Sequence, residues 1–207
     1  MKKKASKHRI THEIMYQQDP VSGNIIIDIA LDKYIYFFHE WDNTAFRKRD
    51  IHPELAAFLD MCSEEIPIRK QFDIHLHVND VAINKEKEDL ILESYYNYYS
   101  SLKRLESRKL KKILRSAILL FIVALAFNAS YLIFASKLTG NLLIGLFTQG
   151  LSIGGWVFMW EALQKVFFES LEPLKRRREL IRFLNADIEF SSDIPIVWQV
   201  ADNDRRV

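Results

Sequence analysis

Two long stretches without a charged residue lie close together in the second half of this chain. They cover residues 116–136 and 142–160. A helix needs roughly 20 mostly apolar residues to cross about 30 Å of bilayer hydrocarbon, and both stretches have that length. A soluble protein could bury such a stretch as a core helix, but two adjacent uncharged runs of this length are rare in soluble domains. We therefore predict two transmembrane helices.

The connection between these helices is short. It covers residues 137–141 and includes the turn formers Gly140 and Asn141. It predicts a hairpin with an external loop and with both chain ends on one side of the membrane. Basic residues gather outside the hairpin, whereas the connection carries Lys137 alone. Because basic flanks favour the cytoplasm, both termini are placed there, in a multi-pass protein of the cell inner membrane.

The basic flanks are expected to lie at the level of the lipid headgroups. They consist of Arg108, Lys109, Lys111, Lys112, Arg115, Lys175, Arg176, Arg177 and Arg178. Each such charge near an anionic membrane surface adds about 1 kcal/mol of attraction. Setting the topology already accounts for these clusters, so this interpretation is favoured over specific binding of anionic headgroups.

Two amide side chains interrupt the apolar runs. Asn128 and Gln149 lie at matching depth, about 12 Å below the outer end of each run. An unpaired amide in lipid is costly, so we expect the two to hydrogen-bond across the hairpin or between protomers. Local bonds within each helix, or a different partner, are the alternatives.

A pair of glycines in the second run has the spacing of a helix-packing motif. Gly150 and Gly154 form a small-xxx-small pair, which lets another helix backbone approach closely. Packing within the hairpin, against Ala124 and Ala126, is favoured because glycines are common in membrane helices. A homo-oligomer interface is the alternative.

The rest of the chain, residues 1–112 and 161–207, predicts one small cytosolic domain built from both chain ends. Segments that are β-branched or alternate in polarity predict strands at 10–16, 25–31 and 72–78, and one or two further strands within 188–198. The first two strands are expected to join through a turn at 19–24. Alternation of strands with helices argues for an α/β (α+β) layer structure attached to the two-helix transmembrane hairpin.

Three helices are expected in this domain. Pro53 opens a short one, Pro173 opens another, and Asn84 caps a long one that starts at about residue 85. The long helix runs without a breaker into the first span. Its apolar residues at heptad spacing, expected to pack on the sheet or on a partner helix, are Ile91, Tyr95, Tyr98, Leu102 and Leu105. Residues 32–52 are expected to form a long loop.

The strand at 72–78 places two histidines on its outward face. His75 and His77 share that face with Asp73. Zinc requires three or four ligands. The loop before the strand holds the further candidates His39, Asp42 and His52. A solvated or hydrogen-bonded sheet face is the default interpretation, and a zinc site at His75 and His77 is the alternative.

Composition and motifs exclude several classes of function. The formal net charge is only +2, so overall charge gives no reason to expect a nucleic-acid partner. Cys62 is the only cysteine, so no intrachain disulfide can form. No apolar segment follows the basic start, so no cleaved signal peptide is expected. The chain also lacks a phosphate-binding loop, a nucleophile elbow, a kinase motif set, a dinucleotide fingerprint and a His-Glu-x-x-His sequence.

A sequence resemblance covers the second span and the helix after it. The span reads Gly154-Gly155-Trp156-Val157-x-Met159-Trp160-Glu161, and Pro173 then opens a basic helix ending in Asp187-Ile-Glu-Phe190. This segment resembles an uncharacterised family of bacterial two-span membrane proteins. The similarity covers chiefly residues 114–190, and Phe46-Arg47-x-Arg49 fits more loosely. It implies the two-span topology and, because the family has no established activity, no functional residues.

Two classes of function remain. The favoured one is a non-enzymatic module that senses, scaffolds or assembles at the inner membrane, with a membrane-perturbing effector as its sharper form. The alternative is a membrane-tethered, metal-dependent enzyme that uses the face of His75 and His77. The first class is favoured because the sequence holds helix-packing features and no catalytic set.

Overall fold

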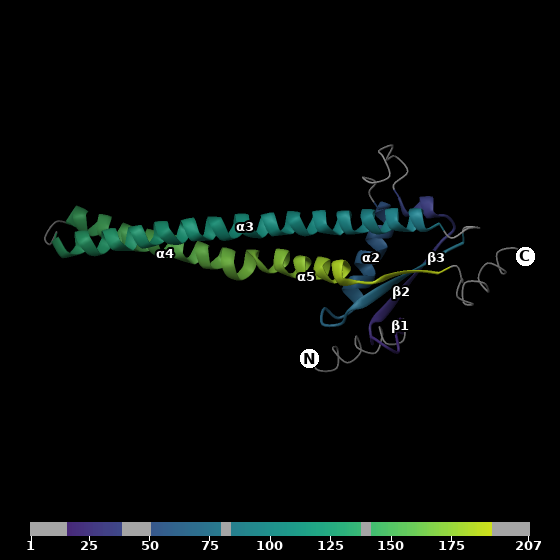
Figure 1. The fold of residues 1–207 in the computed structure, drawn as a ribbon. Coiled ribbons are helices and arrows are strands. Elements are labelled where there is room, and N and C mark those ends of the chain that lie inside the picture. The colour runs from purple at the N-terminus through teal and green to yellow at the C-terminus, as the bar shows by residue number, and fades with distance from the viewer. Residues whose placement is uncertain (1–15, 39–50, 80–83, 138–141, 192–207) are drawn as a thin grey trace, which may run out of the picture. The chain divides into compact units, whose positions relative to one another are not determined.

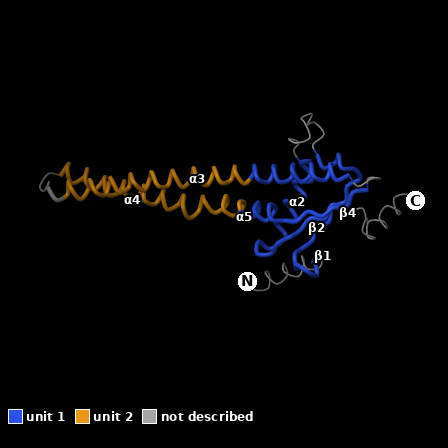
Figure 2. Tube along the Cα trace, in the orientation of Figure 1, with its two compact units in different colours: residues 1–102, 178–207 blue, residues 103–177 orange. Residues whose placement is uncertain are grey.

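The computed structural model of the chain describes residues 16–38, 51–79, 84–137 and 142–191 (Figure 1). Two compact units make up the chain (Figure 2). Unit 1 combines residues 1–102 with residues 178–207, and unit 2 comprises residues 103–177. The described part of unit 1 mixes strands and helices, whereas the described part of unit 2 is helical.

Unit 1 is built on a four-stranded mixed sheet with the strand order β1-β2-β3-β4. The strands are β1 (Gln17–Gln18), β2 (Ile25–Leu31), β3 (Phe72–Val78) and β4 (Ile188–Ser191). β1 pairs antiparallel with β2, whereas β2 with β3 and β3 with β4 pair in parallel. The predictions of strands at 25–31 and 72–78 are confirmed. Residues 10–15 and 192–198 of the two other predicted strands lie outside the described residues.

The connection between β1 and β2 is a tight turn at the predicted position. The Asp19 carboxylate accepts hydrogen bonds from the backbone N–H groups of Val21 and Ser22, at 3.1 and 2.9 Å. Gly23 adopts φ +72°, a left-handed conformation that glycine tolerates better than any other residue. The turn therefore follows from its local sequence.

Three helices supply the core that covers one face of this sheet. They are α2 (Pro53–Glu65), the first part of α3 (Lys85–Lys137) and the last part of α5 (Leu171–Asn185). β2 and β3 contribute alternate residues, because successive side chains of a strand point to opposite faces. The strand residues buried in this core include Ile25, Ile27, Ile29, Phe72, Ile74 and Leu76. From the helices come Leu59, Ile91, Tyr95, Tyr99, Leu180 and Phe183.

The buried stripe of α3 differs from the predicted heptad. Ile91, Tyr95 and Tyr99 are almost fully buried and recur every four residues, whereas Leu105 is 50% exposed. Tyr98 and Leu102 are only partly buried against the core. An α-helix with 3.6 residues per turn that packs on a sheet presents an i, i+4 row, and a heptad row is maintained only where helices supercoil.

The predicted long loop at 32–52 contains ordered core structure. The 3-10 helix η1 (Tyr34–Phe37) occupies its start, and Phe38 forms an isolated antiparallel bridge with Ile51. Tyr34, Phe37, Phe38 and Ile51 are all buried in the core. The aromatic residues of this segment follow no helical or strand period. Their side chains nevertheless bury apolar surface in the core, and this burial holds the segment in place.

Unit 2 contains the apolar part of α3 together with α4 (Leu142–Gln164), the π-helix η3 (Lys165–Glu169) and the first residues of α5. The rings of Phe127 and Phe158 lie 5.3 Å apart, and those of Phe134 and Phe147 lie 6.3 Å apart. The later phenylalanine of α3 therefore contacts the earlier phenylalanine of α4, which shows that the two helices pack antiparallel.

Both apolar helices are long and apolar enough to cross a membrane. Only 11% of the most apolar 18-residue stretch of each is buried. A core helix of a soluble protein would be mostly buried, so this exposure argues against that alternative. In chain order, both helices stand between the neighbouring parallel strands β3 and β4.

Candidate functional site: a pocket at the start of helix α3

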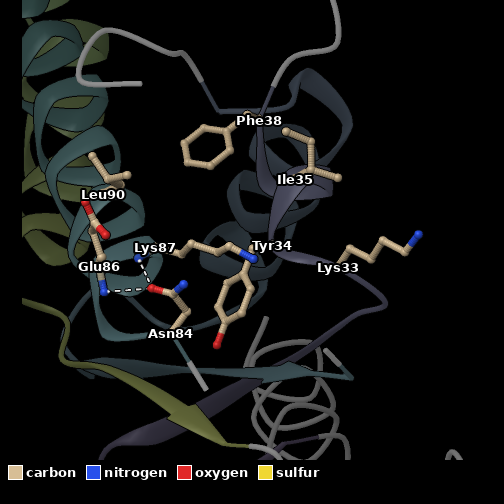
Figure 3. Close-up of a pocket in the computed structure, with 8 residues that line it drawn as sticks. All are labelled: Lys33, Tyr34, Ile35, Phe38, Asn84, Glu86, Lys87 and Leu90. Atoms are coloured by element: carbon tan, nitrogen blue, oxygen red, sulfur yellow. Dashed lines mark hydrogen bonds between the residues drawn. The ribbon is translucent and has the colours of Figure 1, made fainter. Parts of the chain in front are cut away.

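A pocket of about 450 Å³ lies in unit 1, where η1 faces the amino-terminal end of α3 (Figure 3). Its described lining residues are Lys33, Tyr34, Ile35, Phe38, Asn84, Glu86, Lys87 and Leu90. No sequence motif predicts this pocket. The only signals were the aromatic residues at 34–38 and the predicted cap at Asn84, which are far apart in the chain.

The end of α3 that borders the pocket is fixed by its cap. The Asn84 side-chain oxygen accepts hydrogen bonds from the backbone N–H groups of Glu86 and Lys87, at 3.1 and 3.2 Å. The Lys87 N–H also donates to the Asn84 backbone carbonyl at 3.0 Å, whereas the Glu86 N–H belongs to the first turn and has the Asn84 side chain as its acceptor. The predicted start of the helix at residue 85 is thereby confirmed.

Two contacts join η1 to α3 beside the pocket. The Tyr34 hydroxyl donates a hydrogen bond to Glu88 Oε1 at 3.1 Å. The Lys87 ammonium lies over the Tyr34 ring, 5.3 Å from its centroid, within the range of a cation–π contact. Tyr34 is itself buried in the core, so these contacts hold the pocket wall to the folded unit.

The lining combines an apolar wall with a charged rim. Phe38, Ile35 and Leu90 supply the wall, and Lys33, Glu86 and Lys87 the rim. Pockets of this volume and composition typically bind small molecules or peptide side chains. The pocket is therefore suited to binding.

The predicted histidine pair lies on the sheet face opposite the core. His77 Nε2 donates to Asp28 Oδ1 at 3.0 Å, and His75 Nδ1 lies 3.8 Å from the same oxygen. His75 Nε2 lies 3.5 Å from Glu189 Oε2. In the sheet register Asp28 on β2 and Glu189 on β4 stand directly beside His75. His77 is 8% exposed and hydrogen-bonded to Asp28, which agrees with the default interpretation of a solvated or hydrogen-bonded face.

The candidate zinc ligands among the described residues do not form a metal site. His52 lies at the start of α2, where its Nδ1 accepts a hydrogen bond from the Glu54 backbone N–H at 3.3 Å. Among the described residues, no group of three or more histidine, cysteine, aspartate or glutamate side chains is placed to hold a metal ion. His39 and Asp42 lie outside the described residues.

The two amides of the apolar helices do not meet within one chain. Asn128 donates from its side chain to the Ala124 carbonyl at 2.8 Å, which is the local alternative, and it lies against Gly155. Gln149 is exposed on α4, six residues before Gly155. At 1.5 Å per residue this is about 9 Å away along the helix. Pairing between two copies of the chain stays a prediction.

The two predicted packing glycines have different surroundings. A Cβ atom at Gly154 would lie 3.1 Å from the Phe127 ring, so Gly154 faces α3. A Cβ at Gly150 would meet nothing within 4 Å. Gly155, which the spacing did not single out, has the closest neighbours, Asn128 and the Ala124 carbonyl. The contact with α3 therefore runs through Gly154 and Gly155.

The predicted basic flanks lie on two helices. Arg108, Lys109, Lys111, Lys112 and Arg115 lie on α3, just before its apolar part, and residues 175–178 lie on α5. All five α3 residues are exposed. Exposed cations next to an apolar surface are the arrangement expected of groups that face lipid headgroups.

The described residues form a small α+β unit with a pocket, and the chain also has two helices long and apolar enough to cross a membrane. The chain matches no protein-family model, no curated protein and no solved structure. The resemblance of residues 114–190 to two-span bacterial membrane proteins therefore stays a prediction.

Proposed function

We propose that this chain is an integral inner-membrane protein whose α3 and α4 cross the bilayer as a hairpin, with both termini in the cytoplasm. The exposure of large apolar side chains along both helices carries this proposal. Residues more than 55% exposed include Ile118, Leu119, Ile122, Leu132, Leu142, Leu143, Leu146, Phe147, Ile153 and Trp156. A contiguous apolar surface of this kind is unfavourable in water and favourable in lipid.

Membrane extraction tests the integral character. The full chain should remain in the membrane pellet after washes with alkaline carbonate and with high salt, and only detergent should release it. Both washes remove proteins held by charge, whereas a hairpin held by apolar contact with lipid resists them. Release by carbonate would contradict the proposal.

Single-cysteine labelling tests the orientation. Cys62 is 2% exposed, and burial raises the pKa of its thiol, so the native cysteine is a poor target and is replaced in a Cys62→Ser background. In that background Thr139→Cys reports the connection between the spans, and Val21→Cys reports unit 1, where Val21 is 92% exposed. A membrane-impermeant maleimide should label Thr139→Cys in spheroplasts and Val21→Cys only after lysis. The reverse pattern would invert the topology.

Within this framework, unit 1 is a non-enzymatic module that senses or scaffolds. The pocket beside η1 supports this assignment because its apolar wall and charged rim suit binding. A Leu90→Trp substitution would fill the pocket from α3, and Leu105→Trp, at an exposed position of the same helix, is its control. Hydrogen exchange of η1 in cell extract, compared with buffer, should show protection that Leu90→Trp removes and Leu105→Trp preserves. Identical exchange in extract and buffer would argue against a ligand-binding role.

The effector form and the enzyme alternative have separate tests. If the hairpin perturbs the membrane, overproduction should arrest growth and Gly154→Leu should relieve the arrest, because its side chain would displace the Phe127 ring.

If the chain is instead a metal enzyme, purified protein should carry stoichiometric zinc that His75→Ala removes.

A further inference from the structure

Three charged side chains form a ladder just beyond the uncharged run of α4. The Lys165 ammonium lies 3.2 Å from Glu161 and 3.1 Å from Glu169, one turn before it and one turn after it. Lys165 is only 19% exposed. Apolar exposure continues beside the ladder at Leu163, Val166, Phe167, Phe168 and Leu171. The apolar surface thus extends past Trp160, where the uncharged run ends.

The antiparallel packing in unit 2 places this ladder against the start of the uncharged run of α3. Lys165 and Glu169 line one pocket together with Ser116, the first residue of that run, and with Lys109 and Lys112 from the turns before it. The pocket measures about 430 Å³ and is open to the surroundings of the helices. It therefore lies at the boundary where the apolar surface of α3 gives way to charge.

Most of the charged side chains that line this pocket form ion pairs, but one cation and one anion do not. Lys165 is held by Glu161 and Glu169, and Lys109 lies 2.6 Å from Glu106. Of the charged lining residues, Lys112 and Glu172 alone have no ion-pair partner within the described chain. Both are exposed. The pocket thus presents an ammonium and a carboxylate at the level expected for lipid headgroups.

We propose that this pocket binds the zwitterionic headgroup of phosphatidylethanolamine, with Lys112 on the phosphate and Glu172 on the ammonium. The inference rests on the proposed membrane insertion and deepens it. A phosphoglycerol headgroup carries the same phosphate but lacks the ammonium, so it would leave the carboxylate of Glu172 without a cationic partner and repelled by the headgroup's net negative charge. A choline headgroup has no N–H to donate to the carboxylate. The exposed apolar residues Phe168 and Leu171 next to the pocket favour a lipid over free phosphoethanolamine, because they would contact acyl chains.

Lipid retention measured by native mass spectrometry tests this site. The full-length protein is reconstituted with equal amounts of palmitoyl-oleoyl phosphatidylethanolamine, phosphatidylcholine and phosphatidylglycerol, then released from detergent in the spectrometer. Wild type should retain phosphatidylethanolamine in preference to both others. Glu172→Gln should reduce that preference about tenfold, the effect of losing one charge-assisted hydrogen bond. Lys112→Gln should reduce the retention of all three lipids about tenfold, because each of them carries the phosphate. Glu172→Gln should also raise retention of phosphatidylglycerol, because it removes the repelling charge.

Lys111→Gln is the matched control, since Lys111 is an exposed neighbour on the same helix and does not line the pocket. It should leave both the retention of the three lipids and the preference among them unchanged. Equal retention of the three lipids, a preference for phosphatidylglycerol, or equal effects of the Lys111 and Lys112 substitutions would overturn the inference. Displacement of the lipid by soluble phosphoethanolamine would overturn the lipid as the source. Carbonate extraction of the same preparations separates the two proposals, because a resistant protein without lipid preference contradicts only this site.

Discussion

At the scale of single residues, the packing of α3 on α4 depends on which glycines face the neighbouring helix. Gly154 and Gly155 face α3, whereas Gly145 and Gly150 have open space where a side chain would stand. Helices approach closely only where small residues line the contact. Of the small-xxx-small pair, only Gly154 contacts α3 within the chain. A contact of Gly150 with a second copy of the chain stays a prediction.

Substitution at these glycines should separate contact from open positions. Gly155→Leu would bring its side chain into the Asn128 amide and within 3.3 Å of the Ala124 carbonyl. Overpacking of this kind typically costs about 1–3 kcal/mol, so the thermal midpoint of the protein in detergent should fall. Gly150→Leu, on the same helix, should leave the midpoint within experimental error. Equal losses in the two variants would contradict the packing described for α3 and α4.

At the scale of elements, α3 serves both units, and its amino-terminal end also borders the pocket of unit 1. One residue fixes that end, because Asn84 accepts the two N–H groups that begin the helix. The same residue lines the pocket. A change at Asn84 is therefore expected to alter both the stability of this helix end and the geometry of the pocket.

Removal of the cap should destabilise this end of α3 selectively. Asn84→Ala should cost about 1 kcal/mol, whereas Asn84→Ser retains an oxygen that can cap and should lose little. Hydrogen exchange measures the effect, and faster exchange is expected for the first turn of α3 in the alanine variant. An alanine variant that exchanges like the serine variant would show that the cap is not needed there.

At the scale of the whole molecule, the apolar helices divide the sequence of unit 1 into two parts that must meet. Phe183, which follows them in the chain, stacks on Tyr99 with ring centroids 4.3 Å apart and contacts the Phe72 ring at 5.0 Å. The Tyr95 hydroxyl donates to the Phe183 carbonyl at 2.9 Å. Folding of unit 1 therefore requires the segment that comes after both helices.

Truncation of this aromatic side chain should show how far unit 1 depends on α5. Phe183→Ala should cost about 3–5 kcal/mol, as for other fully buried phenylalanines, and it should expose unit 1 to protease at lower urea concentrations. Phe58→Ala is the control, because Phe58 is 41% exposed on α2 of the same unit. A protease-resistance midpoint equal to that of the control would mean that α5 is dispensable for the core.

Local patterns in the sequence determined the elements that depend only on neighbouring residues. The alternation at 72–78, the β-branched run at 25–31 and the cap at Asn84 each specify a structure through contacts a few residues long. The uncharged runs likewise identified both long apolar helices, because the absence of charge over about 20 residues is itself a local property.

Tertiary structure decided what depends on residues far apart in the chain. The aromatic segment at 34–38 became part of the core, and the buried row of α3 shifted from Tyr98 to Tyr99, because the sheet and α5 select the face that is buried. The register of the antiparallel helices brings Asn128 against Gly155 and places Lys112 and Glu172 in the lining of one pocket. The local sequence does not specify either pair. Periodicity fixes which residues share a face, whereas the partner of that face is set by packing between distant segments.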